Sequence, residues 1–199
     1  MNYPKTIKDL IECFKKLPGI GEKTAERLTL STLEIDNEVL DLFSESLKNV
    51  KTKIKRCNKC NNLSEDELCE ICKMKDRDLK TICVVEDVKN VMIFEKVGTY
   101  KGLYHVLDGL ISPLDGINPN DINISSLIER IKNENIHEII LALKPSIEGE
   151  TTSLYISKLL EQENVKITKL AHGIPIGVDM EYIDTLTLEM ALEDRTSVS

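Results

Sequence analysis

Four cysteines in one short polar stretch constrain this 199-residue chain more than any other feature of its sequence. They follow the spacing C-x2-C-x8-C-x2-C, and they are Cys57, Cys60, Cys69 and Cys72. The surrounding segment, 57–80, is rich in Asn and charged residues and has too few aliphatic side chains to build a core. Two C-x2-C pairs can direct four thiolates to one tetrahedral Zn²⁺, although two disulfides or an iron–sulfur cluster would also use four cysteines. We expect one structural Zn²⁺ per chain, because four thiolates leave no position for a reactive water and a reducing compartment keeps thiols free.

The first 56 residues carry apolar side chains at the spacing of α-helices. The pattern breaks at Pro18-Gly19, so we expect a first helix to end near Lys16 and a second helix to begin after Gly21. A third helix is expected from about Asp36, with apolar residues at helical spacing at Val39, Leu40, Phe43, Leu47, Val50 and Ile54. The N-terminal region is therefore predicted to be entirely helical.

The turn between the first two of these helices fits a helix-hairpin-helix, a motif that binds the DNA backbone. Gly19 and Gly21 permit backbone angles closed to other residues, so that amides at the start of the second helix can approach a phosphate closely. Lys23 and Arg27 are four residues apart on one face of that helix and would hold phosphates without reading bases. The alternative is an ordinary turn with a solvated basic face. A nucleotide-binding loop is excluded, because Glu22 stands where such a loop requires Gly before the Lys.

The formal net charge of −8 conceals an uneven distribution of charge. Residues 1–56 hold 11 basic and 9 acidic side chains, whereas residues 81–199 hold 10 basic and 19 acidic ones. Six cations and no acid fall in the window 48–59, namely Lys48, Lys51, Lys53, Lys55, Arg56 and Lys59. This patch is expected to contact DNA, chiefly through Lys48, Lys51 and Lys55, and its alternative is a solvated helix exterior.

Beyond residue 80, short apolar runs alternate with helical patterns, which indicates an α/β fold. The predicted strands are 82–85, 103–107, 139–143 and 165–170, and the predicted helices are 88–96, 124–133 and 150–161. Repetition of strand and helix favours a mostly parallel, Rossmann-like sheet with helices on both faces.

Two strand ends of this region resemble a Toprim domain, the catalytic module of topoisomerases and primases. In that domain an acid after one strand and an Asp-x-Asp pair after another hold magnesium. Glu86 matches the first acid, but Lys144 and Ser146 stand in place of the pair, which is electrostatically wrong for a divalent cation. Glu148 and Glu150 follow and are expected to form an acidic loop that caps the next helix. The alternative function is a magnesium-dependent nuclease, primase or topoisomerase-like enzyme that uses the three glutamates.

The helix-hairpin-helix, the cysteine quartet and the altered Toprim domain, in this order, resemble the bacterial recombination mediators of the RecR family over essentially the whole chain. The tracts that carry the resemblance, besides the cysteines, are 17–21, 100–107, 111–116, 148–150 and 171–175. Segment 177–182 reads Gly-Val-Asp-Met-Glu-Tyr where the family usually has Gly-Gly-Asp-Leu-Glu-Tyr. We expect this segment to be a turn that packs on a neighbouring subunit. His105 and His172 lie in family-like tracts and are expected to be structural, hydrogen-bonded residues.

The resemblance implies a DNA-repair protein with no catalytic residue. It further implies a homo-tetrameric ring that encloses single- or double-stranded DNA irrespective of sequence. The implied partners are RecO and RecF, and with RecO the ring would help to load RecA onto gapped or single-stranded DNA coated by single-strand-binding protein. Glu86, Glu148 and Glu150 are the expected partner-binding residues, because an acidic surface suits a basic protein. The sequence contains neither an apolar membrane span nor a secretory signal, so we expect a cytoplasmic protein with no membrane contact.

The expected domain plan follows the same motifs. A helix-hairpin-helix region for DNA binding and oligomerisation spans 1–56, a four-cysteine zinc finger 57–80, a Toprim domain 81–175 and an intersubunit segment 176–199. Near the N-terminus, four apolar residues form one helical stripe: Ile7, Leu10, Ile11 and Phe14. A helix this short is marginal alone, so we expect the stripe to contribute to assembly, and the alternative is packing entirely within its own subunit.

Overall fold

The computed structural model describes residues 3–171, 173–195 and 197, so His172 lies outside the described residues. The chain divides into two compact units between Ile54 and Lys55, and each unit is described by itself.

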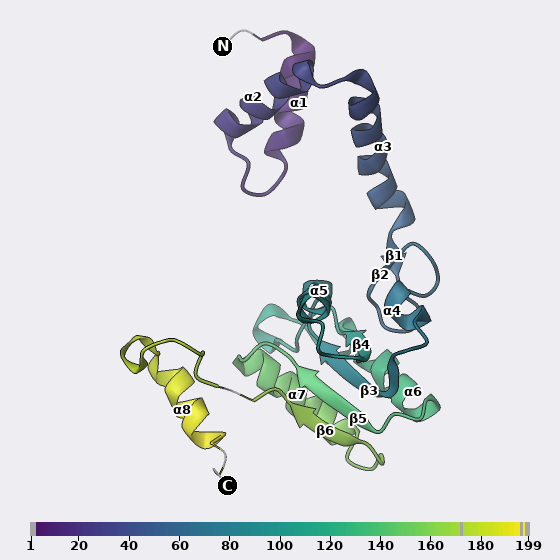
Figure 1. Ribbon diagram of the computed structural model, residues 1–199, viewed down its shortest axis with the longest axis vertical. Helices are drawn as coiled ribbons and strands as arrows, with labels where there is room; N and C mark the ends of the chain where they lie inside the picture. The colour runs from purple at the N-terminus through teal and green to yellow at the C-terminus, as the bar shows by residue number, and fades with distance from the viewer. Residues whose placement is uncertain (1–2, 172, 196, 198–199) are drawn as a thin grey trace. The chain divides into compact units, whose positions relative to one another are not determined.

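The first unit consists of helices, as the apolar spacing predicts (Figure 1). They are α1 (Lys5–Lys15), α2 (Glu22–Ser31), the single 3-10 turn η1 (Thr32–Glu34) and α3 (Asn37–Lys53). Helices α1 and α2 pack against each other and bury Ile11, Ala25 and Thr29. The α1 stripe is therefore partly covered within its own chain.

Helix α3 forms over the predicted residues, but its apolar stripe remains exposed. All 17 residues of α3 are among those described, and none of them is buried. Val39, Phe43, Leu47 and Val50 each expose about half or more of their surface. Helical spacing predicts which residues share a face, but not how far that face is covered. Phe14 of α1 and Leu28 of α2 line a hollow together with Phe43, so the first half of the stripe is only partly open.

The second unit begins with the cysteine-rich segment. A small antiparallel pair, β1 (Lys55–Arg56) and β2 (Leu63–Ser64), precedes the short helix α4 (Glu70–Lys73). The three buried cysteines are the centre of this segment, which confirms that side chains other than aliphatic ones must hold it together.

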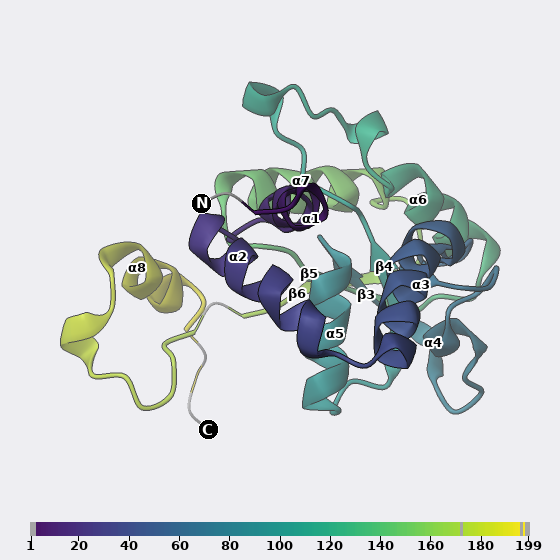
Figure 2. The ribbon, with the colours of Figure 1, turned by 90° about the horizontal axis from the view of Figure 1, so that it is seen from above.

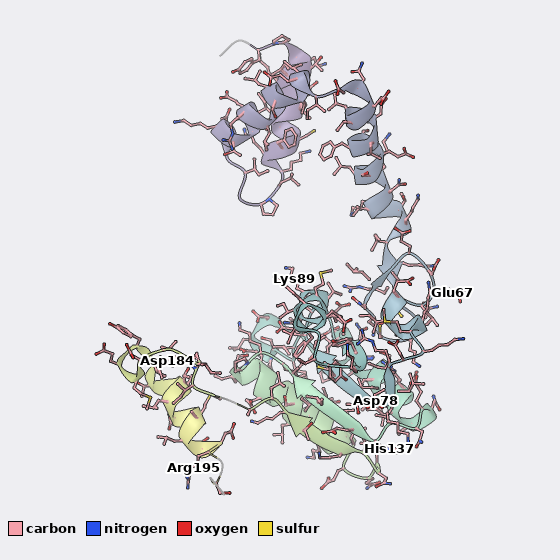
Figure 3. All side chains as sticks on the ribbon, viewed as in Figure 1. Glu67, Asp78, Lys89, His137, Asp184 and Arg195 are labelled. Carbon is pink, nitrogen blue, oxygen red and sulfur yellow. The ribbon has the colours of Figure 1, made fainter. Side chains whose placement is uncertain are left out.

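A parallel four-stranded sheet follows, and the predicted α/β class is confirmed. Its strands are β3 (Asp78–Val85), β4 (Gly102–Val106), β5 (Glu138–Ala142) and β6 (Lys166–Lys169), in the spatial order β4-β3-β5-β6. Val85, at the end of the central strand β3, lies opposite Val106 on one side and Ala142 on the other. Strand β3 begins at Asp78, earlier than expected, and at this amino-terminal end the His137 N–H donates to the Lys80 carbonyl oxygen at 2.8 Å (Figure 3).

Helices cover both faces of the sheet (Figure 2). Helix α5 (Val88–Val97) lies on one face, and α6 (Ile124–Asn133) and α7 (Ile147–Leu159) lie on the other. The alternation of strand β3 divides the core accordingly, because successive side chains point to opposite faces. Ile82 and Val84 join the cluster beneath α6 and α7, whereas Cys83 and Val85 join the cluster beneath α5.

The remaining elements connect or extend this unit. The excursion from β4 to α6 contains two single 3-10 turns, η2 (Pro113–Asp115) and η3 (Pro119–Asp121). The last described elements are η4 (Met180–Tyr182) and α8 (Thr185–Glu193). Within the described ranges, no helix is long and apolar enough to cross a lipid bilayer.

Candidate metal centre and nucleic-acid interface

The four cysteines converge on one point, as their spacing predicts. The sulfur atoms of Cys57, Cys60, Cys69 and Cys72 all lie within 4.8 Å of one another, and the Cys60 and Cys69 sulfurs are 3.5 Å apart. A tetrahedral Zn²⁺ with Zn–S bonds of about 2.3 Å separates its sulfurs by about 3.8 Å, which matches this cluster. The first three cysteines are buried and Cys72 is half-buried, so the centre is closed. The quartet fits one structural zinc ion.

Local turns bring the thiols together. The Cys57 N–H donates to the Asn62 carbonyl oxygen at 2.7 Å, and Asn61 adopts a left-handed conformation with φ of 60°. This tight turn folds the first C-x2-C pair back on itself. The Cys69 N–H then donates to the Cys57 sulfur at 3.2 Å, which joins the second pair to the first. A backbone amide thus faces a sulfur and stabilises negative charge there.

The thiols are also coupled to one another electrostatically. The hydrogen bond between Cys60 and Cys69 raises the pKa of Cys60 and lowers the pKa of Cys69 to about 2. The close approach of the thiols thus opposes their joint ionisation, and a bound Zn²⁺ would remove the repulsion among four thiolates. Four thiolates leave no open coordination position, so the ion supports structure and activates no water.

The cysteine segment attaches to the sheet through polar contacts. The Val106 N–H of edge strand β4 donates to the Cys60 carbonyl oxygen at 2.9 Å. Arg56 forms an ion pair with Asp108 at 2.7 Å, and Lys59 forms one with Glu134 at 3.1 Å. Two of the six cations in the window 48–59 therefore form ion pairs with acids of the second unit. The six cations are thus not all equally available to an external ligand.

The other cations of this window are exposed. Lys48, Lys51 and Lys53 lie on α3, whereas Lys55 lies in β1 of the second unit. The structure thus assigns the three predicted DNA contacts of this window to two units. Their role in DNA binding stays a prediction.

The helix-hairpin-helix turn has the expected form, with one difference between its glycines. Gly19 has φ of +81°, a left-handed conformation that favours glycine. Gly21 has φ of −87° and is the residue that precedes α2, so its backbone conformation does not require glycine. A Cβ at either glycine would meet no described atom within 4 Å, and Gly21 has no side chain that could cap the first amides of α2.

Lys23 and Arg27 lie one helical turn apart in α2, and both are exposed. Among the described residues, neither cation forms a salt bridge. By contrast, Lys15 of α1 pairs with Glu22 at 3.1 Å and thereby joins the two helices beside the turn. The two cations of α2 are thus unpaired within the described chain, in the helix whose first amides have no side-chain cap from Gly21.

The Toprim acids do not converge on one metal position. Within the described chain, the cysteine quartet is the only group of three or more Cys, His, Asp or Glu side chains close enough to share a metal ion. Glu86 follows β3, whereas Glu148 and Glu150 lie in the first turn of α7 and not in the expected loop. The cap of α7 is the Ser146 hydroxyl, which accepts the Gly149 N–H at 3.2 Å. Glu150 pairs with Lys169 at 3.4 Å.

The short tract around Gly149 owes its composition to close packing. A Cβ at Gly149 would lie 1.9 Å from the Lys144 carbonyl oxygen, so only glycine allows α7 to start against the end of β5. Gly102 is similar, since its Cβ would lie 2.2 Å from the Tyr100 hydroxyl. Tyr100 itself donates to the Leu103 carbonyl oxygen at 2.8 Å.

Two buried polar residues stabilise the β4 edge. His105 is fully buried, its Nε2 lies 2.8 Å from the Asn123 carbonyl oxygen, and burial lowers its pKa to about 4. The ring is thus neutral and its Nε2–H donates. Arg130 of α6 donates to the Tyr104 carbonyl oxygen at 2.7 Å. Sequence reasoning missed Arg130, because an arginine within a helical pattern gives no signal that it is buried.

Comparison with known proteins agrees with this geometry along the chain. Residues 7–51 match the family model for the RecR helix-hairpin-helix, 54–73 that for the RecR four-cysteine zinc finger domain, 80–171 that for the Toprim domain and 173–196 that for the RecR C-terminal region. The Recombination protein RecR of Staphylococcus aureus strain Newman is 50% identical over 198 residues, which cover the whole of both chains. The proteins of strains COL and MRSA252 are also 50% identical over the same length.

The chain belongs to the RecR family. Membership in the RecR family places it among recombination proteins and supports a role in recombinational DNA repair. The RecR zinc-finger match and the converging thiols together confirm the predicted structural zinc ion. The Toprim match describes the fold, and the Lys144 and Ser146 positions within it lack the acids of the magnesium-binding pattern.

Proposed function

We propose that this RecR-family chain is a non-enzymatic recombination mediator that binds DNA through α2. The observation that carries the proposal is the exposed pair Lys23 and Arg27 in the helix whose first amides follow Gly21 without a side-chain cap. Backbone amides at a helix N-terminus and two cations on one face complement phosphates of any sequence. The pair would therefore bind single- and double-stranded DNA without reading bases.

Several weak phosphate contacts become effective when identical chains are linked, and we propose a homo-tetrameric ring. Exposed apolar side chains support two self-contacts of the chain. One is the α3 stripe with Leu47 and Val50, and the other is the C-terminal segment with Ile176 and Tyr182. Two different two-fold contacts in one chain can close a ring of four copies.

The ring would act with RecO and RecF in loading RecA onto gapped or single-stranded DNA coated by single-strand-binding protein. Glu86, Glu148 and Glu150 are the proposed partner-binding residues. They belong to a region with 19 acidic and 10 basic side chains, which repels DNA and attracts a basic protein. In this proposal residues 1–56 bind DNA and assemble, 57–80 form the zinc finger, 81–175 receive the partner and 176–199 form the second self-contact.

The test compares a double variant with a matched control. Lys23→Ala with Arg27→Ala should weaken binding to unrelated single- and double-stranded sequences by similar factors. The salt dependence should become shallower by roughly 0.9 for each duplex phosphate that a chain ceases to bind. Lys89→Ala with Lys96→Ala removes two exposed cations from α5 and should change neither quantity (Figure 3).

The same proteins should then be assayed for RecA filament formation on gapped DNA coated by single-strand-binding protein, with RecO present. The α2 double variant should fail to stimulate filament formation, whereas the α5 control should retain it. An unchanged salt slope in the α2 variant would reject the proposed DNA contact. Magnesium-dependent cleavage or joining of DNA that is lost in Glu86→Ala would instead support an enzyme.

A further inference from the structure

The loop between β4 and α6 presents one large apolar side chain almost fully to solvent. Leu114, within η2, is 97% exposed, while Leu110 and Ile111 at the base of the same loop are buried. The loop projects from the layer of α6 and α7 (Figure 2). An isolated exposed leucine is ordinary on most surfaces, but this one stands at the tip of a loop whose conformation is fixed.

The loop is rigid because hydrogen bonds and restricted residues hold both of its sides. Ser112 and Ile117 exchange two backbone hydrogen bonds, of 3.0 and 2.9 Å, and close the turn. The Ser112 hydroxyl donates to Asp115 at 2.6 Å, and Pro113 and the left-handed Gly116 fix the backbone on either side of the tip. The backbone at Leu114 is thus held in one conformation without a partner, which lowers the entropy cost of binding.

The base of the loop is anchored to α7. The Ile111 N–H donates to the Thr152 hydroxyl at 2.9 Å, and Thr152 in turn donates to the Glu148 carbonyl oxygen at 2.6 Å. Thr152 is fully buried, so this connection is shielded from water. The loop and the first turn of α7 therefore form one surface.

This shared surface is charged around its apolar residues, because Asp115 and Glu148 supply carboxylates and Lys144 supplies a cation that acts on Glu148. The carboxylate of Asp115 is close enough to Glu148 to oppose its ionisation. The pKa of Glu148 nevertheless lies below its ordinary value, chiefly because its own backbone N–H and then the Ser146 hydroxyl donate to it. Ile147, beside Glu148, is 82% exposed. Two exposed apolar side chains thus accompany two carboxylates.

We propose that Leu114 is the apolar anchor of the partner-binding surface, and that it inserts into an apolar socket rimmed by Lys or Arg on a basic protein. This inference rests on the proposed function and deepens it, since Glu148 is one of the proposed partner-binding residues. Asp115 and Glu148 provide the charge complementarity that orients the partner. Insertion of Leu114 between DNA bases is disfavoured, because both carboxylates would face phosphates.

The experiment measures the affinity of the full-length chain for purified RecO and, separately, for single- and double-stranded DNA. Leu114→Ala should weaken RecO binding by at least about tenfold, as truncation of a central anchor does. Leu79→Ala is the matched control, because Leu79 is 55% exposed at the opposite, amino-terminal end of the sheet. Asp115→Asn should weaken RecO binding and reduce its salt dependence. Neither loop variant should change DNA affinity or the mass of the chain in solution.

Each other outcome overturns the inference in a recognisable way. Undiminished RecO affinity in Leu114→Ala would reject the anchor and leave the proposed function intact. Loss of DNA affinity alone would make the loop a DNA contact, and a change in solution mass would make it a self-contact. Failure of the unaltered chain to bind RecO would reject the proposed partnership together with this inference.

Discussion

The backbone N–H of Val106 donates a 2.9 Å hydrogen bond to the carbonyl oxygen of Cys60, so the zinc finger occupies the edge of the sheet. Strand β4 is an edge strand, and its outward amides would otherwise lack a backbone partner on this side. The cysteine turn therefore both supplies metal ligands and satisfies the last amide of the edge strand.

Removal of zinc should consequently destabilise the neighbouring edge of the sheet. Chelation, or Cys69→Ser, should accelerate hydrogen exchange at Val106, because the carbonyl oxygen of Cys60 is positioned by the folded metal site. The Ile140 amide lies in the central part of the sheet and should keep its protection. Hydrogen exchange followed by mass spectrometry measures both. Equal protection of Val106 with and without metal would contradict the coupling.

The α3 stripe should govern assembly and not folding. Replacing Leu47 and Val50 by Ser should reduce a tetramer to a dimer held by the C-terminal contact while the chain keeps its helical content, because both side chains are exposed within a single chain. Leu42→Ser is the control, since Leu42 is 65% exposed but lies off the stripe. Light scattering gives the masses. A full-size assembly in the double variant would show that the stripe is not an interface.

The buried His105 should make stability depend on pH in a defined window. Its pKa in the folded chain is lowered to about 4 from 6.5, so only the unfolded chain takes up this proton as pH falls between these values. The free energy of unfolding should decrease over this range, by up to about 3 kcal/mol from this residue, and should not respond to it above pH 6.5. His105→Gln keeps a donor for Asn123 and should flatten this part of the profile. Urea unfolding at several pH values tests this, and parallel profiles for the two proteins would contradict it.

The two glycines of the hairpin should separate folding from DNA binding. Gly19→Ala should destabilise the N-terminal unit by about 1 kcal/mol, because a side chain is strained at φ of +81°. Gly21→Ala should change stability by less than about 0.5 kcal/mol, since its φ is ordinary. It should nevertheless weaken DNA binding if phosphates approach the first amides of α2. Thermal melts with DNA titrations distinguish the two effects, and unaltered affinity in Gly21→Ala would place the phosphate elsewhere.

Much of the architecture could be predicted from local pattern. The cysteine spacing predicted the zinc centre, because two C-x2-C turns are short enough to determine their own geometry. The alternation of apolar strands and helices predicted the parallel sheet, because period and length are properties of neighbouring residues. The ordered motifs also predicted the RecR family, which the comparisons confirm.

The sequence by itself thus determined the identity of the elements and of the metal ligands. Only the tertiary structure decided which faces are covered and which charges are paired. Spacing marks the apolar stripe of α3, but only the fold leaves it open. Arg56 and Lys59 belong to a cationic run in sequence, yet acids at Asp108 and Glu134 engage them. Burial and ion pairing depend on segments far apart along the chain. Local periodicity contains no information about which distant segment packs against a given face or charge.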